Sequence, residues 1–410
     1  MIRLLLGALA LQCALTACGA QEIATQSSVA AWRADLRYLA GELPRRHVNA
    51  FHGVSKEHFA AAVKNLDAAL PGLNDDQALA GLMRIVALVG DGHTHLDLPP
   101  AAATYPLELM WFGKELRIIA AAARDSTVVG ARVVGIGGIA LDSAIALVSW
   151  LVPRGENDLR TRLTATILLT SPRVLHALGI SRSDRRADFA LVTRDGIAVT
   201  KTLTAVLSRE VTGWRFATDQ PPLWLRRLAE PWWVEALPAA KTVYLSFSRY
   251  PPEAEFQARC AELGRVLDQS AARRIVIDLR RNGGGDFTLV RRYLLPVLKA
   301  RPAIDHAGGV YAIIGPVTFS AAMVNTLDLK RELTATLVGE PTGARPNSYS
   351  EHADFQLPNS GLRVSYSTRY YRFGEDSATA VQPDRRIEPT WKDFQLGRDA
   401  VLDWILSQPN

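Results

Sequence analysis

RIVIDLRRNGGGD, residues 274–286, is the stretch that decides the fold. Its first half is a short apolar run rich in β-branched residues, which predicts a strand buried on both faces of a sheet. The three glycines 283–285 then allow positive φ angles and a close approach to the backbone amides, and such a turn can build a group of N–H donors for an anion. The stretch therefore predicts a buried strand that ends in an anion-binding turn.

The segments that follow lead to one serine. We expect a helix over 286–300 and a second buried strand in GVYAIIG, residues 309–315, followed by PVTFSAAM, residues 316–323. A strand, a sharp bend, a serine and then a helix, here expected over 321–333, is the arrangement that exposes a nucleophile at a helix N-terminus. Ser320 is therefore the candidate nucleophile, and the alternative is that it only caps the helix.

Four short motifs in this half of the chain carry a family resemblance. They are Asp278-x-Arg280-x-Asn282-x-Gly284-Gly285, Thr318-x-Ser320-Ala321, Val338-Gly339-Glu340-x-Thr342-Gly343 and Val381-x-Pro383-Asp384. Together they resemble the carboxyl-terminal processing (tail-specific) and tricorn-core serine peptidase family. The resemblance implies an α/β fold with a crotonase/ClpP-like spiral core, placed here at 241–410, a polypeptide substrate and no metal or organic cofactor.

The N-terminus has the pattern of an export signal. A charged start is followed by an apolar run over residues 4–11 that is too short to span a bilayer. Residues 15–19, LTACG, match the bacterial lipoprotein cleavage pattern, so we expect residues 1–18 to form the signal, with cleavage before a lipidated Cys18. This predicts a protein anchored on the periplasmic side of a bacterial membrane. The alternative is an ordinary signal ending near Ala20 and a soluble periplasmic or secreted protein.

Composition limits the number of domains and the kinds of partner that the chain can have. The chain has 410 residues, of which 48% are hydrophobic, and this is enough to build two or three domains. The net charge of +6 is spread along the chain without aromatic residues interleaved among the basic ones, so no nucleic-acid partner is expected. Cys260 would be the one thiol left after processing, and its helical surroundings predict a buried apolar role. The oligomeric state is not indicated by the sequence.

Upstream of the core we expect two modules and a connection. Residues 28–97 show helical apolar spacing and predict a helical N-terminal domain. Residues 105–205 alternate short strands and turns, close with a hairpin, and resemble a PDZ module without its usual carboxylate-binding loop. Residues 206–240 hold four tryptophans beside prolines, and we interpret them as a packed connection, although a substrate-facing wall is the alternative.

The segment DGHTHLD, residues 91–97, gathers two histidines and two aspartates. On a strand, Asp91, His93, His95 and Asp97 would all point to one face, and such a face could bind a metal. A metal-dependent hydrolase that uses Asp91, His93 and His95 is therefore a third hypothesis. The family resemblance instead implies that the histidine of a Gly-Asp-x-His sequence at this place is the general base, as in the tricorn-like and chlamydial members.

The family offers two kinds of base for the serine. In the tail-specific branch a lysine stands where this chain has Arg345, and an arginine stays protonated and cannot act as a base. That leaves a Ser–His arrangement in which His93 is the base and an acid orients the imidazole. By resemblance the acid is Glu375 or Asp376, and the oxyanion donors are the N–H groups of Gly284 and Ala321.

These observations predict an exported serine endopeptidase that hydrolyses polypeptides by a Ser–His–acid mechanism. The main alternative is a non-catalytic binding protein of the same fold, for a small apolar ligand or a polypeptide. The absence of the family's lysine is compatible with that alternative, whereas His93, Ser320 and the three glycines favour the enzyme.

Overall fold

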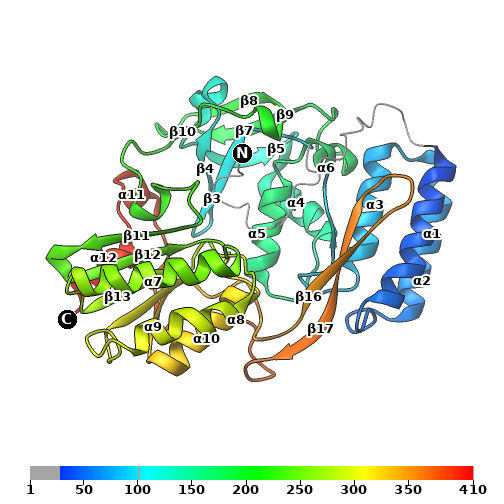
Figure 1. Ribbon diagram of the computed structural model, residues 1–410. Helices are drawn as coiled ribbons and strands as arrows, with labels where there is room; N and C mark the ends of the chain where they lie inside the picture. The colour runs from blue at the N-terminus through cyan, green and yellow to red at the C-terminus, as the bar shows by residue number, and fades with distance from the viewer. Residues whose placement is uncertain (1–27, 100–101, 410) are drawn as a thin grey trace.

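The computed structural model describes residues 28–99 and 102–409 and is drawn in Figure 1. The expected signal and Cys18 lie outside the described residues. Over the two described ranges, no helix combines the length and the apolar character needed to cross a membrane.

Three helices form one side of the molecule, and each begins at a residue that caps it. Ser28, Ser55 and Asn74 accept a hydrogen bond from a backbone N–H of the first turn, and Asn74 forms a reciprocal capping box with Gln77. The helices are α1 (Val29–Arg46), α2 (Lys56–Ala69) and α3 (Asp75–Ala87), with a 3₁₀ turn, η1 (Leu70–Gly72), between the last two.

The middle of the chain builds an antiparallel seven-stranded sheet with helices beside it. Strand order is β10-β4-β5-β7-β8, with β3 paired to β4 and β6 to β5, and the hairpin predicted near 187–203 is β7–β8. The strands are β3 (Leu107–Phe112), β4 (Glu115–Ala121), β5 (Arg132–Ile136), β6 (Ile139–Ala140), β7 (Arg186–Val192), β8 (Ala198–Thr204) and β10 (Arg215–Phe216). Two further short strands, β2 (Ala103–Thr104) and β9 (Val206–Leu207), pair with each other. The helices are α4 (Leu141–Val148), α5 (Asp158–Leu168) and α6 (Pro172–Ala177), and the 3₁₀ turns are η2 (Ala123–Val128), η3 (Ser149–Leu151) and η4 (Ser208–Glu210).

A six-stranded sheet forms the core that holds the nucleophile, in the order β11-β12-β13-β14-β15-β18. The two strands expected around 274–280 and 309–315 are confirmed as β13 (Arg274–Asp278) and β14 (Val310–Ile314), parallel neighbours that are buried along their whole length. The other strands are β11 (Trp232–Leu237), β12 (Thr242–Phe247), β15 (Thr336–Gly339) and β18 (Arg385–Arg386). β11 lies inside the segment predicted to be a connection, because its tryptophans pack into the sheet and its backbone pairs antiparallel with β12.

Helices cover the core sheet, and the two helical segments expected in this region are present (Figure 1). α10 (Ala321–Leu333) occupies the expected 321–333, and the segment 286–300 is helical but contains one π-helical stretch, η7 (Val290–Leu294). The remaining helices are α7 (Glu253–Gln269), α8 (Phe287–Leu289), α9 (Leu295–Lys299), α11 (Trp391–Gln395) and α12 (Ala400–Ser407), and the remaining 3₁₀ turns are η5 (Leu223–Leu225) and η6 (Pro238–Ala240). Cys260 on α7 is a buried free thiol, as expected.

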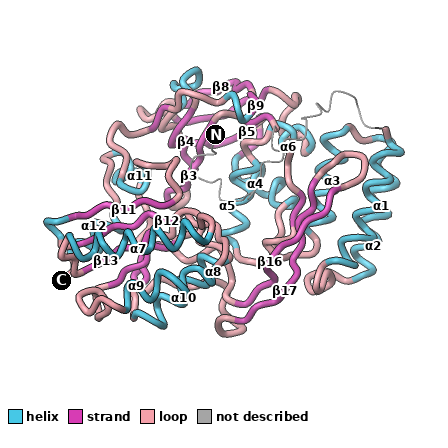
Figure 2. Tube along the Cα trace, viewed as in Figure 1, coloured by secondary structure: helices cyan, strands magenta, loops and turns pink. Residues whose placement is uncertain are grey.

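A long hairpin joins the core to the helical side. Its strands are β16 (Asn347–Gln356) and β17 (Arg363–Arg372), and β17 also pairs with β1 (His95–Leu96). Figures 1 and 2 show the hairpin running from the level of α10 to α1 and α3. At its tip, the buried Asp35 of α1 accepts hydrogen bonds from the N–H and side-chain amide of Asn359 and from the N–H of Ser360.

Candidate active site

Ser320 stands at the N-terminus of α10 with a backbone that few non-glycine residues adopt, at φ 50° and ψ −125°. Such strain persists only where the surrounding structure enforces it, and it often marks a functional position. The side chain makes no capping hydrogen bond with the helix, so the simple cap is not what the structure shows. Its Oγ lies 2.9 Å from Nε2 of His93, a residue 227 positions earlier in the chain.

The glycine turn lies directly against the serine. A Cβ placed on Gly284, where φ is +114°, would be 2.7 Å from the Cβ of Ser320 and 3.1 Å from the carbonyl oxygen of Phe319. The glycine turn is also hydrogen-bonded to the segment before Ser320, because the N–H of Phe319 donates to the carbonyl of Asn282. Only glycine fits at position 284 without a shift of the nucleophile.

The two expected oxyanion donors differ in their present partners. Ala321 is the first residue of α10, and the first N–H groups of a helix have no acceptor within it. The N–H of Gly284 instead donates to Oδ1 of Asn282, at 2.9 Å. A substrate oxyanion would have to replace that side-chain oxygen before Gly284 could serve.

His93 is held in a buried turn between α3 and β1. Its ring stacks on Phe319, with the ring centroids 4.7 Å apart, and its Nε2 also lies 3.3 Å from Oγ of Ser350 on β16. Burial lowers the pKa of His93 to about 3, although the nearby carboxylate of Asp91 acts in the opposite direction. The imidazole is therefore neutral at physiological pH, the state in which it can accept the proton of a serine hydroxyl.

The other nitrogen of His93 has no acceptor. Nδ1 is buried and makes no hydrogen bond to any part of the chain that the structure describes. If Nε2 accepts the Ser320 hydroxyl, Nδ1 must carry the proton, so a buried N–H is left without a partner. This is the atom that the acid of a Ser–His–acid arrangement would meet.

The two predicted acids are not at that atom. Glu375 and Asp376 are both exposed, in the turn that follows β17. Asp376 accepts a hydrogen bond from the side chain of Asn347, and neither carboxylate is hydrogen-bonded to His93 in the described residues. Their assignment stays a prediction, and it requires the segment 373–376 to approach the imidazole.

Asp91 is the buried carboxylate next to His93. Its Oδ1 accepts the backbone N–H of His93 and the hydroxyl of Ser367, and its Oδ2 lies 2.9 Å from Nε2 of His47. Burial acts to raise the pKa of Asp91, but the hydrogen bonds from His47 and Ser367 lower it below its usual value. Asp91 thus carries a negative charge that fixes the turn bearing His93.

The geometry does not support the hypothesis of a metal at Asp91, His93 and His95. Residues 91–94 form a turn and not a strand, so His93 faces Ser320 while His95 pairs with Asp97. Over the described residues, the ligand atoms that do converge belong to His47, His52 and Asp91. There Nδ1 of His47 accepts the N–H of Asn49, so its Nε2 must carry the proton given to Asp91 and cannot bind a metal in this arrangement.

Glu156, before α5, is a site residue that sequence reasoning missed. It is buried, and its two carboxyl oxygens accept the N–H of Gly92, which precedes His93, and the N–H of Arg345. Burial raises the pKa of Glu156 to about 7, although these two hydrogen bonds act to lower it. The two donors lie 64 residues earlier and 189 residues later in the chain, so no local motif could reveal it.

Arg345 occupies the position of the family's lysine but faces another way. Its guanidinium donates to the carbonyl of Gly155, and its backbone N–H holds Glu156. The residue therefore fastens the loop after β15 to the loop before α5. A role as a base is excluded by its chemistry, as expected from the sequence.

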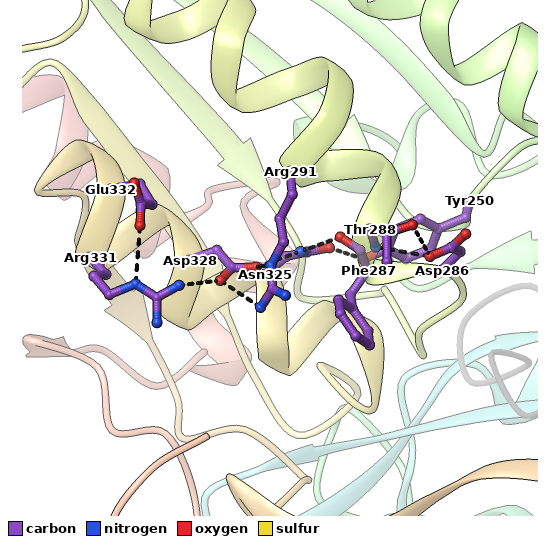
Figure 3. Close-up of polar contacts among 9 residues, drawn as sticks. All are labelled: Tyr250, Asp286, Phe287, Thr288, Arg291, Asn325, Asp328, Arg331 and Glu332. Carbon is purple, nitrogen blue, oxygen red and sulfur yellow. Dashed lines mark hydrogen bonds and ion pairs between the residues drawn. The ribbon is translucent and has the colours of Figure 1, made fainter. Parts of the chain in front are cut away.

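A polar network fixes α10 behind the nucleophile (Figure 3). Tyr250 packs against Gly285 of the glycine turn, and its hydroxyl donates to Oδ1 of Asn325 on α10. Asn325 donates to the carbonyl of Phe287 and to the buried Asp328, which also pairs with Arg291. A helix held by buried, fully paired groups gives Ser320 a rigid base.

Comparison with known proteins identifies the fold. No family model and no curated protein matches the sequence. The structure of mature CPAF complexed with lactacystin aligns over 92% of this chain and 97% of its own, with 12% identity and a TM-score of 0.64. The photosystem II D1 C-terminal processing protease (17% identity, 92% of this chain and 99% of its own) and the tricorn protease (13%, 93% and 36%) each align with a TM-score of 0.39.

CPAF is a tail-specific, S41-type peptidase, so the resemblance predicted from the motifs is found again in the comparison of folds. At 12% identity the similarity to CPAF establishes the mixed α/β fold and no more. The PDZ-like character of the middle sheet stays a prediction.

Proposed function

We propose that this protein is a serine endopeptidase in which Ser320 is the nucleophile and His93 the general base. The observation that carries the proposal is the 2.9 Å contact between Ser320 Oγ and His93 Nε2, made across 227 residues of chain. A hydroxyl is a weak nucleophile unless a base lies within hydrogen-bond reach, and this base is neutral and buried. The similarity of the fold to that of CPAF also supports a serine peptidase.

The reaction would proceed in two halves. His93 Nε2 takes the Ser320 proton as Oγ adds to the carbonyl carbon of the peptide bond, and the N–H of Ala321 stabilises the oxyanion. The intermediate collapses when the C–N bond breaks, and the imidazolium gives its proton to the leaving amine. A water molecule, deprotonated by His93, then hydrolyses the acyl-enzyme and restores the serine.

The imidazolium formed midway needs a negative charge nearby. Asp91 supplies one in the present arrangement, since its carboxylate acts to raise the pKa of His93. We keep Glu375 or Asp376 as the acid that would accept the Nδ1–H of His93 when the substrate is bound, which would pair the buried nitrogen that now has no partner. In this mechanism Asp91 supplies a fixed negative charge, and Glu375 or Asp376 accepts the Nδ1–H of His93.

The site of action is part of the proposal. We infer that the chain is exported and anchored through a lipidated Cys18 on the periplasmic side of a bacterial membrane, with a polypeptide substrate. The pattern of residues 1–19 supports this. A soluble exported enzyme is the alternative.

A binding protein of the same fold is the second candidate function, and a fluorophosphonate probe separates the two. The enzyme should be labelled covalently at one serine, and peptide mapping should place the label on Ser320. Ser320→Ala should abolish the labelling, whereas Ser248→Ala, which removes a partly buried hydroxyl elsewhere in the core, should retain it. Labelling that persists in Ser320→Ala, or an unlabelled protein that still cuts a peptide, would remove Ser320 from the mechanism.

A further inference from the structure

A cavity of about 170 Å³ lies between the middle sheet and the core. One wall comes from β3, β4 and α5, and the opposite wall from the carboxyl ends of β14 and β15 and the C-terminal segment 387–401. Ligands of α/β proteins commonly bind at the carboxyl ends of parallel strands. Ser320, His93 and Gly284 do not line the cavity, so it is a site separate from the candidate active site.

The cavity is lined mainly by apolar side chains, and its aromatic wall is fixed. The indole N–H of Trp111 donates to the hydroxyl of Thr166, and the guanidinium carbon of Arg162 lies 3.5 Å from the Trp111 ring centroid. Other apolar lining residues are Met110, Leu163, Trp224, Ile314, Ile387 and Phe394. A pre-formed space with a mainly apolar lining is typical of a small-molecule site.

One of the lining carboxyl groups is left without a hydrogen bond. The carboxyl of Glu340, at the end of β15, makes none to any described residue, whereas Arg280 is paired with Asp278 and Asp399. Burial, followed by the charge of Glu388, raises the pKa of Glu340 to about 7. Protonated or not, this carboxyl offers an acceptor oxygen that a ligand could pair.

We propose that this cavity binds a small aromatic molecule that carries one hydrogen-bond donor, such as a phenol or an indole, with the donor on Glu340. The size agrees, because a dry cavity of about 150 Å³ can hold a benzene ring. The lining residues Trp111 and Phe394 suit an aromatic ring, and the acceptor of Glu340, which has no hydrogen bond, suits one donor. The inference does not depend on the proposed catalytic activity.

The test uses 4-fluorophenol and the full chain, observed by fluorine NMR. Saturable binding is expected, and fluorobenzene, which lacks the donor, should bind about 3- to 10-fold more weakly because one hydrogen bond is missing. Glu340→Leu should remove this preference for the phenol.

Two tryptophan variants locate the site. Leu159 lines the cavity and is partly exposed, so Leu159→Trp should fill the space and abolish binding. Leu147 lies on α4 outside the cavity and is 38% exposed, so Leu147→Trp is the matched control and should bind as the wild type does. No saturable binding to the wild type, or equal binding to Leu159→Trp, would overturn the proposal.

Discussion

Gly284 and Ser320 are in such close contact that any side chain at position 284 would meet the nucleophile, with 2.7 Å between the two Cβ atoms. Gly284→Ala should therefore reduce turnover at least 100-fold, since it displaces Ser320 from His93 and also strains a residue at φ +114°. Gly308→Ala separates the two effects. Gly308 also has a positive φ, +84°, but the nearest atom to an added Cβ is 4.0 Å away, so this variant should keep its activity. Equal losses in both variants would show that contact with Ser320 is not the cause.

The choice of base gives a second prediction. His93→Ala should lower kcat about 1000-fold, because the serine would lose its proton acceptor. Arg345→Lys restores the residue of the tail-specific branch, but position 345 points its guanidinium at Gly155 and not at Ser320, so turnover should not rise. Peptide hydrolysis by the purified variants measures both effects. Near-normal turnover in His93→Ala would refute the Ser–His assignment.

Burial of His93 also predicts how stability depends on pH. Its pKa is about 3 in the folded chain, against 6.5 for an ordinary histidine. Below pH 6.5 the unfolded chain therefore binds a proton that the folded chain does not, and folding loses about 1.4 kcal/mol per pH unit. Relative to His93→Gln, the wild type should lose about 2 kcal/mol of unfolding free energy between pH 6.5 and 5.

This effect must be measured as a difference between the two proteins in urea unfolding at each pH. Glu156 and Glu340, both with a pKa raised to about 7, bind a proton in the folded chain over part of the same range and act with the opposite sign. They are present in both proteins and cancel in the comparison. A difference that stays constant from pH 7 to 5 would contradict a neutral, buried His93.

Asp35 should control the attachment of the β16–β17 hairpin. Asp35→Ala leaves the two N–H groups and the amide at the hairpin tip without their acceptor, which should cost about 3 kcal/mol. Asp268→Ala is the control, because that carboxylate is 62% exposed and its ion pair with Arg301 is a surface pair, a kind that contributes little to stability. Urea unfolding measures the loss, and hydrogen exchange should show the added opening in the hairpin. Unchanged exchange there would mean that the tip is held by other contacts.

The anchor prediction concerns Cys18. Each buried methylene of an acyl chain contributes about 0.8 kcal/mol, so a lipidated protein should stay on membranes during a high-salt wash that removes a protein held by charge alone. Cys18→Ser should block lipoprotein processing. Mass spectrometry of the mature N-terminus gives the answer. An unmodified chain that begins after Ala20 and is released freely would establish a soluble exported protein.

The sequence predicted what depends on local pattern. Buried strands with β-branched residues, a glycine turn and a serine before a helix are local features, and the structure has β13, β14 and α10 where they were expected. The motifs also indicated the fold. Ser320 and His93 could be paired before the structure was known because the family resemblance connected two distant segments.

What the sequence could not reveal depends on contacts between distant segments. Glu156 joins two loops through backbone N–H groups, which carry no sequence signal. The alternation of Asp91, His93, His95 and Asp97 indicated a common face only if the segment was a strand, and the turn at 91–94 separates them. Trp232 and Trp233 were read as part of a connection because prolines surround them, whereas their burial makes β11 an edge strand of the core.

The hairpin gives the candidate site an unusual dependence on chain integrity. β17 pairs with the strand that follows His93, Ser367 holds Asp91, and Ser350 on β16 contacts His93 itself. The hairpin starts at the core, after the helix that follows Ser320, and its tip contacts α1. His93 is therefore held opposite Ser320 by a hairpin that contacts both the core and the helical side. A single cut near residue 359 would release the hairpin tip from Asp35, and the position of His93 would then rest on the pairing of the two strands with each other and with β1.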